Sequence, residues 1–332
     1  MSVPWTITQM SQLAVLLEVS SPKPGNVNRE AGFSDSSFRH FLASAAAMGR
    51  GIHLAASRGT LAAAGELSLS EIGIGEAILT TVRDVFTRLN RSNTILGTIL
   101  LHAPLATAMG ACAYESGGIH PRELRPWIRR VINATTVDDT LNVYRALRIV
   151  MPRGDRHKAT SAWTEFHARY DIENPHVLEN VKNDRMTLHT LFTASAQIDR
   201  VSREWANGFE TVIETLWPAL RGPLHGLEDA EEAIVDLFIR QLAEEPDGHI
   251  AKRAGIEAAQ YVMQAAKDVI ASTENREVRI RDLDTVLRSR GNELNPGSTA
   301  DLVSAAVFCR LVEIEMLTAT HTETTTSSTL SE

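Results

Sequence analysis

The 332-residue sequence contains only two cysteines, Cys112 and Cys309, and few aromatic residues. Both cysteines lie in apolar segments with helical periodicity, which excludes a disulfide framework and a cysteine-based zinc site. Phe, Trp and Tyr together make up 5% of the residues, and this scarcity disfavours a sandwich of β-sheets. The first residues lack a basic region followed by an apolar run, so we expect a cytoplasmic protein.

The sequence also lacks an excess of basic charge. Its formal net charge is −8, and only five of the 33 basic residues are lysines. Binding to nucleic acid through a broad basic face is therefore disfavoured, whereas a local basic pocket is compatible with this balance. Hydrophobic residues at 43% and charged residues at 22% are typical of a globular protein.

Residues 95–114 form the one long stretch without Asp, Glu, Lys or Arg. About 20 residues is the length of a membrane span, but this stretch contains His102 and Pro104 and has no counterpart elsewhere in the chain. We interpret it as the buried central helix of a soluble protein, and we expect no membrane partner.

Apolar residues recur with the period of a helix, and no segment alternates long enough to predict a strand. The sequence therefore predicts one all-α, bundle-like domain over residues 5–317. The expected helices cover residues 7–20, 35–57, 70–90, 93–115, 121–133, 138–149, 186–217, 228–244, 249–272, 280–290 and 298–317. The expected loops are residues 20–34 and 151–184, the latter with room for a short helix, and residues 318–332 are expected to be a disordered tail.

Residues 21–29 read Ser-Pro-Lys-Pro-Gly-Asn-Val-Asn-Arg and predict a stiff loop. The two prolines fix the backbone, and Pro24-Gly25 suits a tight turn. The loop is expected to expose Lys23, with Asn26 and Arg29 just beyond the turn, and such groups suit a phosphate chain. The alternative is a loop that ends a helix and leaves Lys23 in solvent.

Two further segments place polar groups where helices are expected to begin. Asp35 is either the N-terminal cap of the second helix or a ligand of Mg²⁺, which prefers carboxylate and water oxygens. Asn93 and Thr94 precede Gly97 at the start of the most apolar helix, where backbone amides bind anions. Ordinary capping by Ser92 or Asn93 is the alternative.

Three later segments have a similar character. Thr136-Val-Asp138-Asp139 resembles a capping box, although its paired acids also suit a metal ion. Pro246-Asp-Gly-His-Ile-Ala-Lys252 places Asp247 and Lys252 at a turn that opens a helix, and a lysine there opposes the helix dipole. Asn295-Pro-Gly-Ser-Thr-Ala-Asp301 is either a capping box or a turn whose amides hold phosphate while Asp301 binds metal or ribose.

A helical bundle can bring such junctions to one end and form a polar mouth over an apolar core. We therefore predict that the loop 21–29 and the helix start 295–301 line one pocket, with Asn93 and Asp247 on its wall. Neither capping nor turn formation requires these segments to meet.

Three of these motifs resemble the triphosphoribosyl-dephospho-CoA synthase family. The resemblance rests on the segments 21–27, 93–97 and 295–302, which occur in the family's order. It implies an all-helical enzyme that displaces adenine from ATP and transfers the 5-triphosphoribosyl group to the 2′-hydroxyl of dephospho-CoA. The product is the precursor of the prosthetic group of citrate or malonate lyase-type enzymes.

The sequence departs from the family pattern at two places. Where the family has His-Lys-Asp after the first loop, this chain keeps only Asp35, and where it has Asn-Thr-His-Lys-Gly, this chain has Ile95 and Leu96 in place of His and Lys. The chain therefore resembles a divergent branch, in which the acceptor is dephospho-CoA or a related small molecule such as a pterin-type carrier.

Displacing adenine passes through an oxocarbenium-like state, which needs a carboxylate near C1 and groups that move protons. The catalytic candidates are Asp35, Asp247 and Asp301, and the candidates for a Mg²⁺ site are Asp35, Asp138 and Asp301. The nucleotide- and phosphate-binding candidates are Lys23, Gly25, Asn26, Arg29, Asn93, Thr94, Lys252, Asn295, Gly297 and Ser298. Two alternatives stay open, a Mg²⁺-dependent helical nucleotide hydrolase or phosphatase and a non-catalytic helical scaffold.

Overall fold

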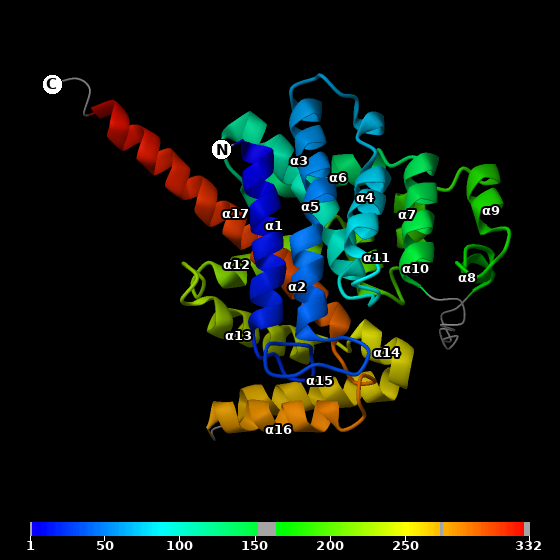
Figure 1. Ribbon diagram of the computed structural model, residues 1–332, viewed down its shortest axis with the longest axis vertical. Helices are drawn as coiled ribbons and strands as arrows, with labels where there is room; N and C mark the ends of the chain where they lie inside the picture. The colour runs from blue at the N-terminus through cyan, green and yellow to red at the C-terminus, as the bar shows by residue number, and fades with distance from the viewer. Residues whose placement is uncertain (1, 152–163, 273–274, 329–332) are drawn as a thin grey trace.

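The computed structural model describes residues 2–151, 164–272 and 275–328, with only the backbone described for residues 318–328. Throughout these ranges all regular secondary structure is helical, which confirms the all-α prediction. Four helices form the centre of the molecule: α1 (Val3–Ser20), α3 (Gly49–Ala63), α5 (Leu96–Ser116) and α17 (Gly297–Ser328). They run close to one another through the middle of the bundle (Figure 1).

Helix α5 is the core helix that the uncharged stretch predicts. Every residue from Thr98 to Ala113 is buried. By length and composition α5 is the one helix of the described chain that passes as a membrane span, but 89% of its most apolar window is buried inside the protein. Neighbouring helices therefore provide its apolar surroundings.

Helices α4 (Ile74–Val85), α6 (Pro121–Asn133) and α7 (Val137–Val150) cover one side of this centre. The bounds of α6 and α7 agree closely with the prediction, because local chemistry sets both helix starts. Pro121 occupies the first position of α6, and Thr136 and Asp139 form the expected capping box of α7.

The long helices predicted over 35–57 and 70–90 are each divided. The first becomes α2 (Phe38–Ala47) and α3, and the second becomes the short η1 (Leu69–Glu71) and α4. Helix α2 begins three residues later than expected, because Ser37 and His40 form a capping box there. One interpretation of the sequence made Asp35 the N-terminal cap of this helix. That interpretation is wrong, because the cap is Ser37.

The segments predicted as helices over 186–217 and 249–272 also bend. The first contains α10 (Leu188–Ser195), α11 (Arg200–Asn207), the π-helical η2 (Thr211–Leu216) and α12 (Trp217–Leu220). The second is divided into α14 (Gly248–Ala254) and α15 (Ile256–Ala271). The division falls at Gly255, whose φ of 98° is a backbone conformation that other residues rarely adopt.

Two predicted loops contain helices. The segment 151–184 contains α8 (Glu165–Arg169) and α9 (Val177–Asn183), which pack on α7 around a small second core that includes Tyr144 and Val181. Residues 152–163 lie outside the described part. The expected disordered tail instead continues α17 as far as Ser328, because no glycine or proline interrupts a helix that is already formed. Residues 329–332 are not described.

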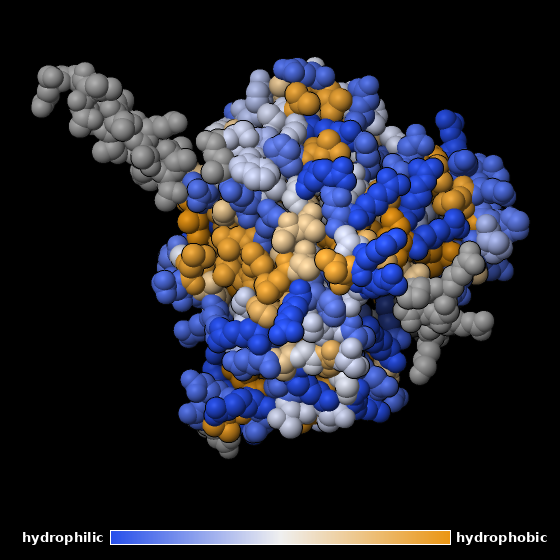
Figure 2. Space-filling view, in the orientation of Figure 1, coloured by the Kyte–Doolittle hydropathy of each residue, from blue (hydrophilic) through white to orange (hydrophobic). Residues whose placement is uncertain are grey.

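The lower end of the bundle positions the site. Helices α13 (Ala230–Glu244), α15 and α16 (Arg276–Arg288) lie across this end, and the loop after α1 runs between them and the upright helices (Figure 1). The surface over this region is mostly hydrophilic, whereas an apolar area lies higher, at the left of the molecule (Figure 2). The loop after α1 and the start of α17 therefore lie at one end of an apolar bundle, whereas the start of α7, with Asp138, lies away from them.

Candidate active site

The first and last motifs of the sequence are in contact at this end, while their lining one pocket with Asn93 and Asp247 stays a prediction. The Asn26 side-chain amide donates a hydrogen bond to Asn295 Oδ1 at 2.8 Å. Arg288 Nη2 donates to the Asn26 carbonyl at 2.5 Å, and the Gly25 amide donates to Asp284 Oδ1 at 2.7 Å. Residues more than 250 positions apart in sequence thus hold the loop 21–29 against α16 and the start of α17.

Lys23 is not exposed, contrary to the expectation from sequence. Its side chain is completely buried, and Nζ lies 3.0 Å from Glu18 Oε1 at the end of α1. Nζ also donates to the Glu18 carbonyl and, at 3.3 Å, to the Ser21 carbonyl. Burial lowers the pKa of Lys23 and raises the pKa of Glu18, and the attraction between the two charges opposes both shifts. The lysine turns back onto the helix that precedes it.

Asp301 is the fifth residue of α17 and faces the start of α5. Thr98 Oγ1 donates a hydrogen bond to Asp301 Oδ1 at 2.6 Å. A Cβ atom on Gly97 would lie only 2.2 Å from Asp301 Oδ2, so the glycine allows α5 to approach the carboxylate. Burial raises the pKa of Asp301 to about 7, and the nearby negative charges of Glu18 and Asp247 act in the same direction.

Asp247 is also buried, and both oxygens of its carboxylate accept hydrogen bonds from backbone amides at the starts of helices. Oδ1 accepts hydrogen bonds from the amides of His249 at 2.8 Å and Ile250 at 3.1 Å, which makes Asp247 the cap of α14. Oδ2 accepts from the amide and the hydroxyl of Thr299, both at 2.7 Å. Asp247 therefore joins the start of α14 to the start of α17, and this geometry favours a positioning role over a catalytic one.

A chain of side-chain amides leads from the loop 21–29 to Asp35. Asn26 donates to Asn295, Asn295 Nδ2 donates to Asn292 Oδ1 at 2.8 Å, and Asn292 Nδ2 lies 2.9 Å from both carboxylate oxygens of Asp35. Asp35 is exposed, so it stands at the rim of the site and not at its centre.

Several predicted phosphate-binding groups are already engaged. Arg29 pairs with Glu231 of α13 at the surface, and Lys252 pairs with Asp199 at 2.7 Å. Although burial opposes ionisation, the Lys252 ammonium and the Ser202 donors lower the pKa of Asp199 to about 2. Arg29 and Lys252 thus stabilise contacts between elements, and the structure does not direct them into the site.

The small residues of the two Pro-Gly turns have packing roles as well. The Gly25 amide is used by Asp284, and a Cβ atom on Gly25 would collide with Leu287. Ser298 Oγ accepts a hydrogen bond from the His249 amide at 3.2 Å, and Gly297 lies against the His249 ring. These contacts fix the start of α17 at the site.

Asp138 lies away from the other candidates. Its neighbour Asp139 accepts a hydrogen bond at 2.8 Å from the amide of Gly75, at the start of α4. Ser92, which follows the opposite end of α4, contacts the site by donating to the Asp35 carbonyl at 2.6 Å. Asp138 is thus separated from the site by the length of α4, and the structure does not join it to Asp35 or Asp301.

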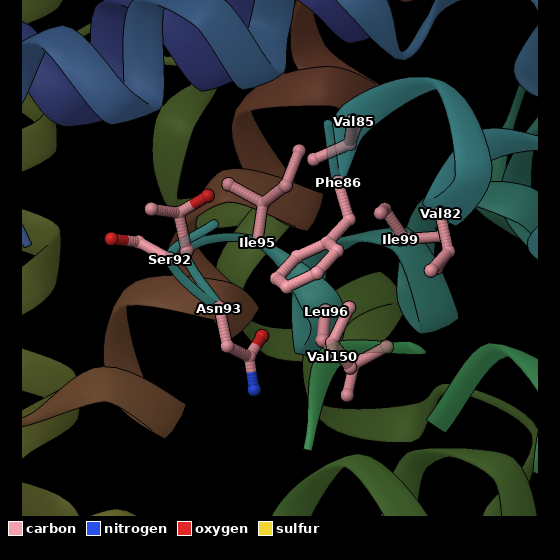
Figure 3. Close-up of a pocket in the computed structure, with 10 residues that line it drawn as sticks. Val82, Val85, Phe86, Ser92, Asn93, Ile95, Leu96, Ile99 and Val150 are labelled. Atoms are coloured by element: carbon pink, nitrogen blue, oxygen red, sulfur yellow. The ribbon is translucent and has the colours of Figure 1, made fainter. Parts of the chain in front are cut away.

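Asn93 and Thr94 border a small pocket at the junction of α4 and α5. Apolar residues such as Phe86, Leu96 and Val150 line it (Figure 3). Asn93 is exposed at its edge, and Thr94 Oγ1 lies 2.7 Å from Ser44 Oγ. Helix α5 begins at Leu96, so neither Ser92 nor Asn93 caps it. Gly97 and Thr98, and not Asn93, form the part of this segment that contacts Asp301.

Sequence reasoning missed Glu18, Thr98, Arg200 and Asn292. Arg200 is 3% exposed and donates to Thr299 Oγ1 at 2.8 Å, so it supports the start of α17. The signal for Glu18 was present in the sequence, since it is the one acid of an otherwise uncharged expected helix and lies five residues before Lys23. Arg200 and Asn292 gave no local signal.

Among the described residues no group of three or more His, Cys, Asp and Glu side chains is arranged to hold a metal ion. A magnesium ion that arrives with a triphosphate needs one or two protein carboxylates, because phosphate oxygens and water complete its coordination. Asp35 at the rim and Asp301 at the centre each fit that smaller requirement.

Comparison with known proteins gives a consistent result. Residues 4–318 match the protein family described as ATP:dephospho-CoA triphosphoribosyl transferase. A 2-(5''-triphosphoribosyl)-3'-dephosphocoenzyme-A synthase from Pectobacterium atrosepticum is 31% identical over 101 residues, which is 30% of this chain and 33% of that protein. A relative from Pectobacterium carotovorum, described by the same activity, is 30% identical over the same shares. The aligned part thus spans about a third of each of these curated relatives.

A solved structure shows the same fold. The crystal structure of a protein from Archaeoglobus fulgidus, described as a triphosphoribosyl-dephospho-CoA synthase, superposes with a TM-score of 0.56 at 21% identity. The match covers 82% of this chain and 98% of that chain.

Proposed function

Because the chain belongs to the ATP:dephospho-CoA triphosphoribosyl transferase family, we propose that it is a transferase that uses ATP in this way. It moves the 5-triphosphoribosyl group of ATP, with release of adenine, to the 2′-hydroxyl of dephospho-CoA or a closely related acceptor. The observation that carries the proposal is the position of Asp301, at the point where the three family-like motifs meet.

Asp301 suits the proton transfers of this reaction. The bond between ribose C1′ and adenine N9 breaks, and a bond forms between C1′ and the acceptor oxygen. The acceptor hydroxyl loses one proton and the departing adenine gains one, so no proton is gained or lost overall. A carboxyl group with a pKa of about 7 exchanges protons readily near neutral pH, as general acid–base catalysis requires.

The surrounding charges favour the same assignment. An oxocarbenium-like ribose is electron-poor, and the carboxylates of Glu18 and Asp301 place negative charge near it. Lys23 is buried against Glu18 and therefore acts by holding that carboxylate in place. The side-chain amides of Asn26, Asn292 and Asn295, which are linked to one another by hydrogen bonds, would offer hydrogen bonds to phosphate or ribose oxygens.

Magnesium is part of the proposal. When bound with ATP, the ion would neutralise charge on the triphosphate, and Asp35 or Asp301 would be its protein ligand. The convergence of the motifs also argues against the non-catalytic scaffold, which predicts that the polar junctions point to different ends of the bundle.

The proposal is tested by measuring adenine release and ATP binding for the Asp301→Asn variant. We expect release of adenine from Mg-ATP in the presence of dephospho-CoA to fall by about 100-fold or more, with the dissociation constant for ATP changed less than about threefold, because the charge acts mainly in the transition state. Thr285→Ala, an exposed change on α16, is the control. Equal adenine release by the wild type and Asp301→Asn would contradict the proposal.

A further inference from the structure

The segment 86–95, between α4 and α5, forms one side of the rim of the site. Ser92 Oγ donates to the Asp35 carbonyl at 2.6 Å, which holds the segment against the loop after α1. Asn90 is 2% exposed and anchors the segment to α2, with Nδ2 donating to Ser44 Oγ at 2.7 Å and to the His40 carbonyl at 3.2 Å. The segment is therefore held on two sides, and Thr87, Arg88, Leu89 and Arg91 are among its exposed residues, whereas Ile95 is buried.

Three arginines and a leucine project from this part of the surface. Leu89 is 94% exposed, the highest value among the large hydrophobic residues of the described chain. Arg88 and Arg91 flank it, and Arg39 precedes His40, whose carbonyl accepts from Asn90; all three arginines are exposed. We call these four residues the arginine rim.

The arginine rim is not neutralised by neighbouring acids. Across the described residues, no carboxylate lies within 4.0 Å of a nitrogen of Arg39, Arg88 or Arg91. By contrast, Arg29 and Arg288, on the other side of the site, pair with Glu231 and Asp284. In a protein of net charge −8, this leaves a local group of unpaired positive charges beside the site.

We propose that the arginine rim binds the pyrophosphate and the pantetheine arm of the acceptor. This inference rests on the proposed function and names the place where the acceptor is held. The 2′-hydroxyl must reach Asp301, so the rest of the acceptor projects outward past the rim. Guanidinium groups suit the pyrophosphate, and Leu89 suits the apolar dimethyl part of the arm. The triphosphate of ATP has no such apolar part, which favours the acceptor over ATP as the ligand here.

The inference is tested by calorimetric titration of the full chain with dephospho-CoA. We expect the Arg88→Ala/Arg91→Ala double variant to bind dephospho-CoA about tenfold more weakly, and Leu89→Ala to bind it severalfold more weakly. The wild-type affinity should fall as salt is raised, and the fall should be smaller for the double variant, because exposed charges are screened. Binding of Mg-ATP should be unchanged in both variants.

Arg122→Ala provides the matched control. Arg122 is an exposed arginine that follows the far end of α5, about 30 Å from the rim by the length of that helix. Its replacement should leave dephospho-CoA binding unchanged. The inference is overturned if the double variant binds dephospho-CoA as the wild type does, if it loses affinity for Mg-ATP instead, or if the wild type does not bind dephospho-CoA. Adenine release from ATP is measured separately, so failure of the rim and failure of the proposed function are distinguishable.

Discussion

Among single residues, burial should affect protein stability most clearly at Lys23. It forms a completely buried ion pair with Glu18, and the loss of one partner leaves the other charge buried and uncompensated. We therefore expect Lys23→Met to lower the free energy of unfolding by about 3–5 kcal/mol, measured by urea denaturation. An exposed loop lysine, by contrast, would contribute little to the free energy of unfolding.

Two variants control this prediction. Arg29→Ala breaks an ion pair with Glu231 in which both side chains are 45% exposed, and it should cost much less. The double variant Glu18→Gln/Lys23→Met should lose less stability than the sum of the two single changes. A Lys23→Met protein as stable as Arg29→Ala would show that the buried pair does not exist in solution.

Asp301 predicts a pH dependence of stability. Its pKa of about 7 in the folded protein lies above the value of about 3.9 expected in the unfolded chain. Between these values the unfolded state releases the proton and the folded state keeps it, so stability falls as pH rises, by up to roughly 1.4 kcal/mol per pH unit.

Asp301→Asn should remove this contribution, because asparagine does not titrate. We expect the unfolding free energy of the wild type, relative to Asp301→Asn, to decrease from pH 4 to pH 7 and to level off above pH 7. Denaturant unfolding of both proteins across this range measures the difference. A difference that is constant, or that rises with pH, would mean that the carboxyl does not have a raised pKa.

Gly97 links the sequence motif to the site. A Cβ atom there would lie 2.2 Å from Asp301 Oδ2 and 2.7 Å from its Cγ, so Gly97→Ala must displace the Asp301 carboxylate or push α5 and α17 apart. We expect a loss of stability of about 1–3 kcal/mol and a larger loss of adenine release. Gly118→Ala, where no atom lies within 4 Å of the added Cβ, should change neither. Full activity in Gly97→Ala would argue against close packing of the two helix starts.

Among the elements, those with strong local signals were predicted best. Pro121 and the Thr136–Asp139 capping box set the starts of α6 and α7, and both helices begin within a residue of the expected position. The segment 186–217 was predicted as one helix, since its apolar period is continuous, but the cap at Asp199 and the positive φ of Gly208 divide it. Periodicity alone does not show such breaks.

Asp247 joins α14 to α17, and this contact between two helices gives a testable prediction. It caps α14 and also accepts two hydrogen bonds from Thr299 in α17. We expect Asp247→Ala to lower the unfolding free energy by about 2–4 kcal/mol, since it removes a cap and leaves buried donors unpaired. Asn275→Ala removes only the exposed cap of α16 and should cost about 1 kcal/mol. Equal losses would indicate that the contact with Thr299 contributes nothing.

For the whole molecule, the sequence predicted that the first and last motifs converge but not how they are held together. We predicted the convergence because a single nucleotide ligand would need binding groups from both motifs. The pairs that secure it, such as Arg200 with Thr299 and Asn292 with Asp35, join residues far apart in the chain. Their residue types are common in helices and loops, so only the tertiary structure identifies them. The burial of Lys23 was missed for a different reason, because its partner Glu18 lies only five residues earlier and was not considered as a partner.

In the proposed reaction the ribose of ATP, and not its adenine, passes to the acceptor. The most direct measurement incubates the protein with Mg²⁺, dephospho-CoA and ATP that is labelled either in the ribose or in the adenine ring, and analyses the products by mass spectrometry. We expect ribose label in a product heavier than dephospho-CoA by one triphosphoribosyl group, and adenine label in an equal amount of free adenine. Free adenine or phosphate formed without a labelled acceptor would contradict it and would identify a hydrolase.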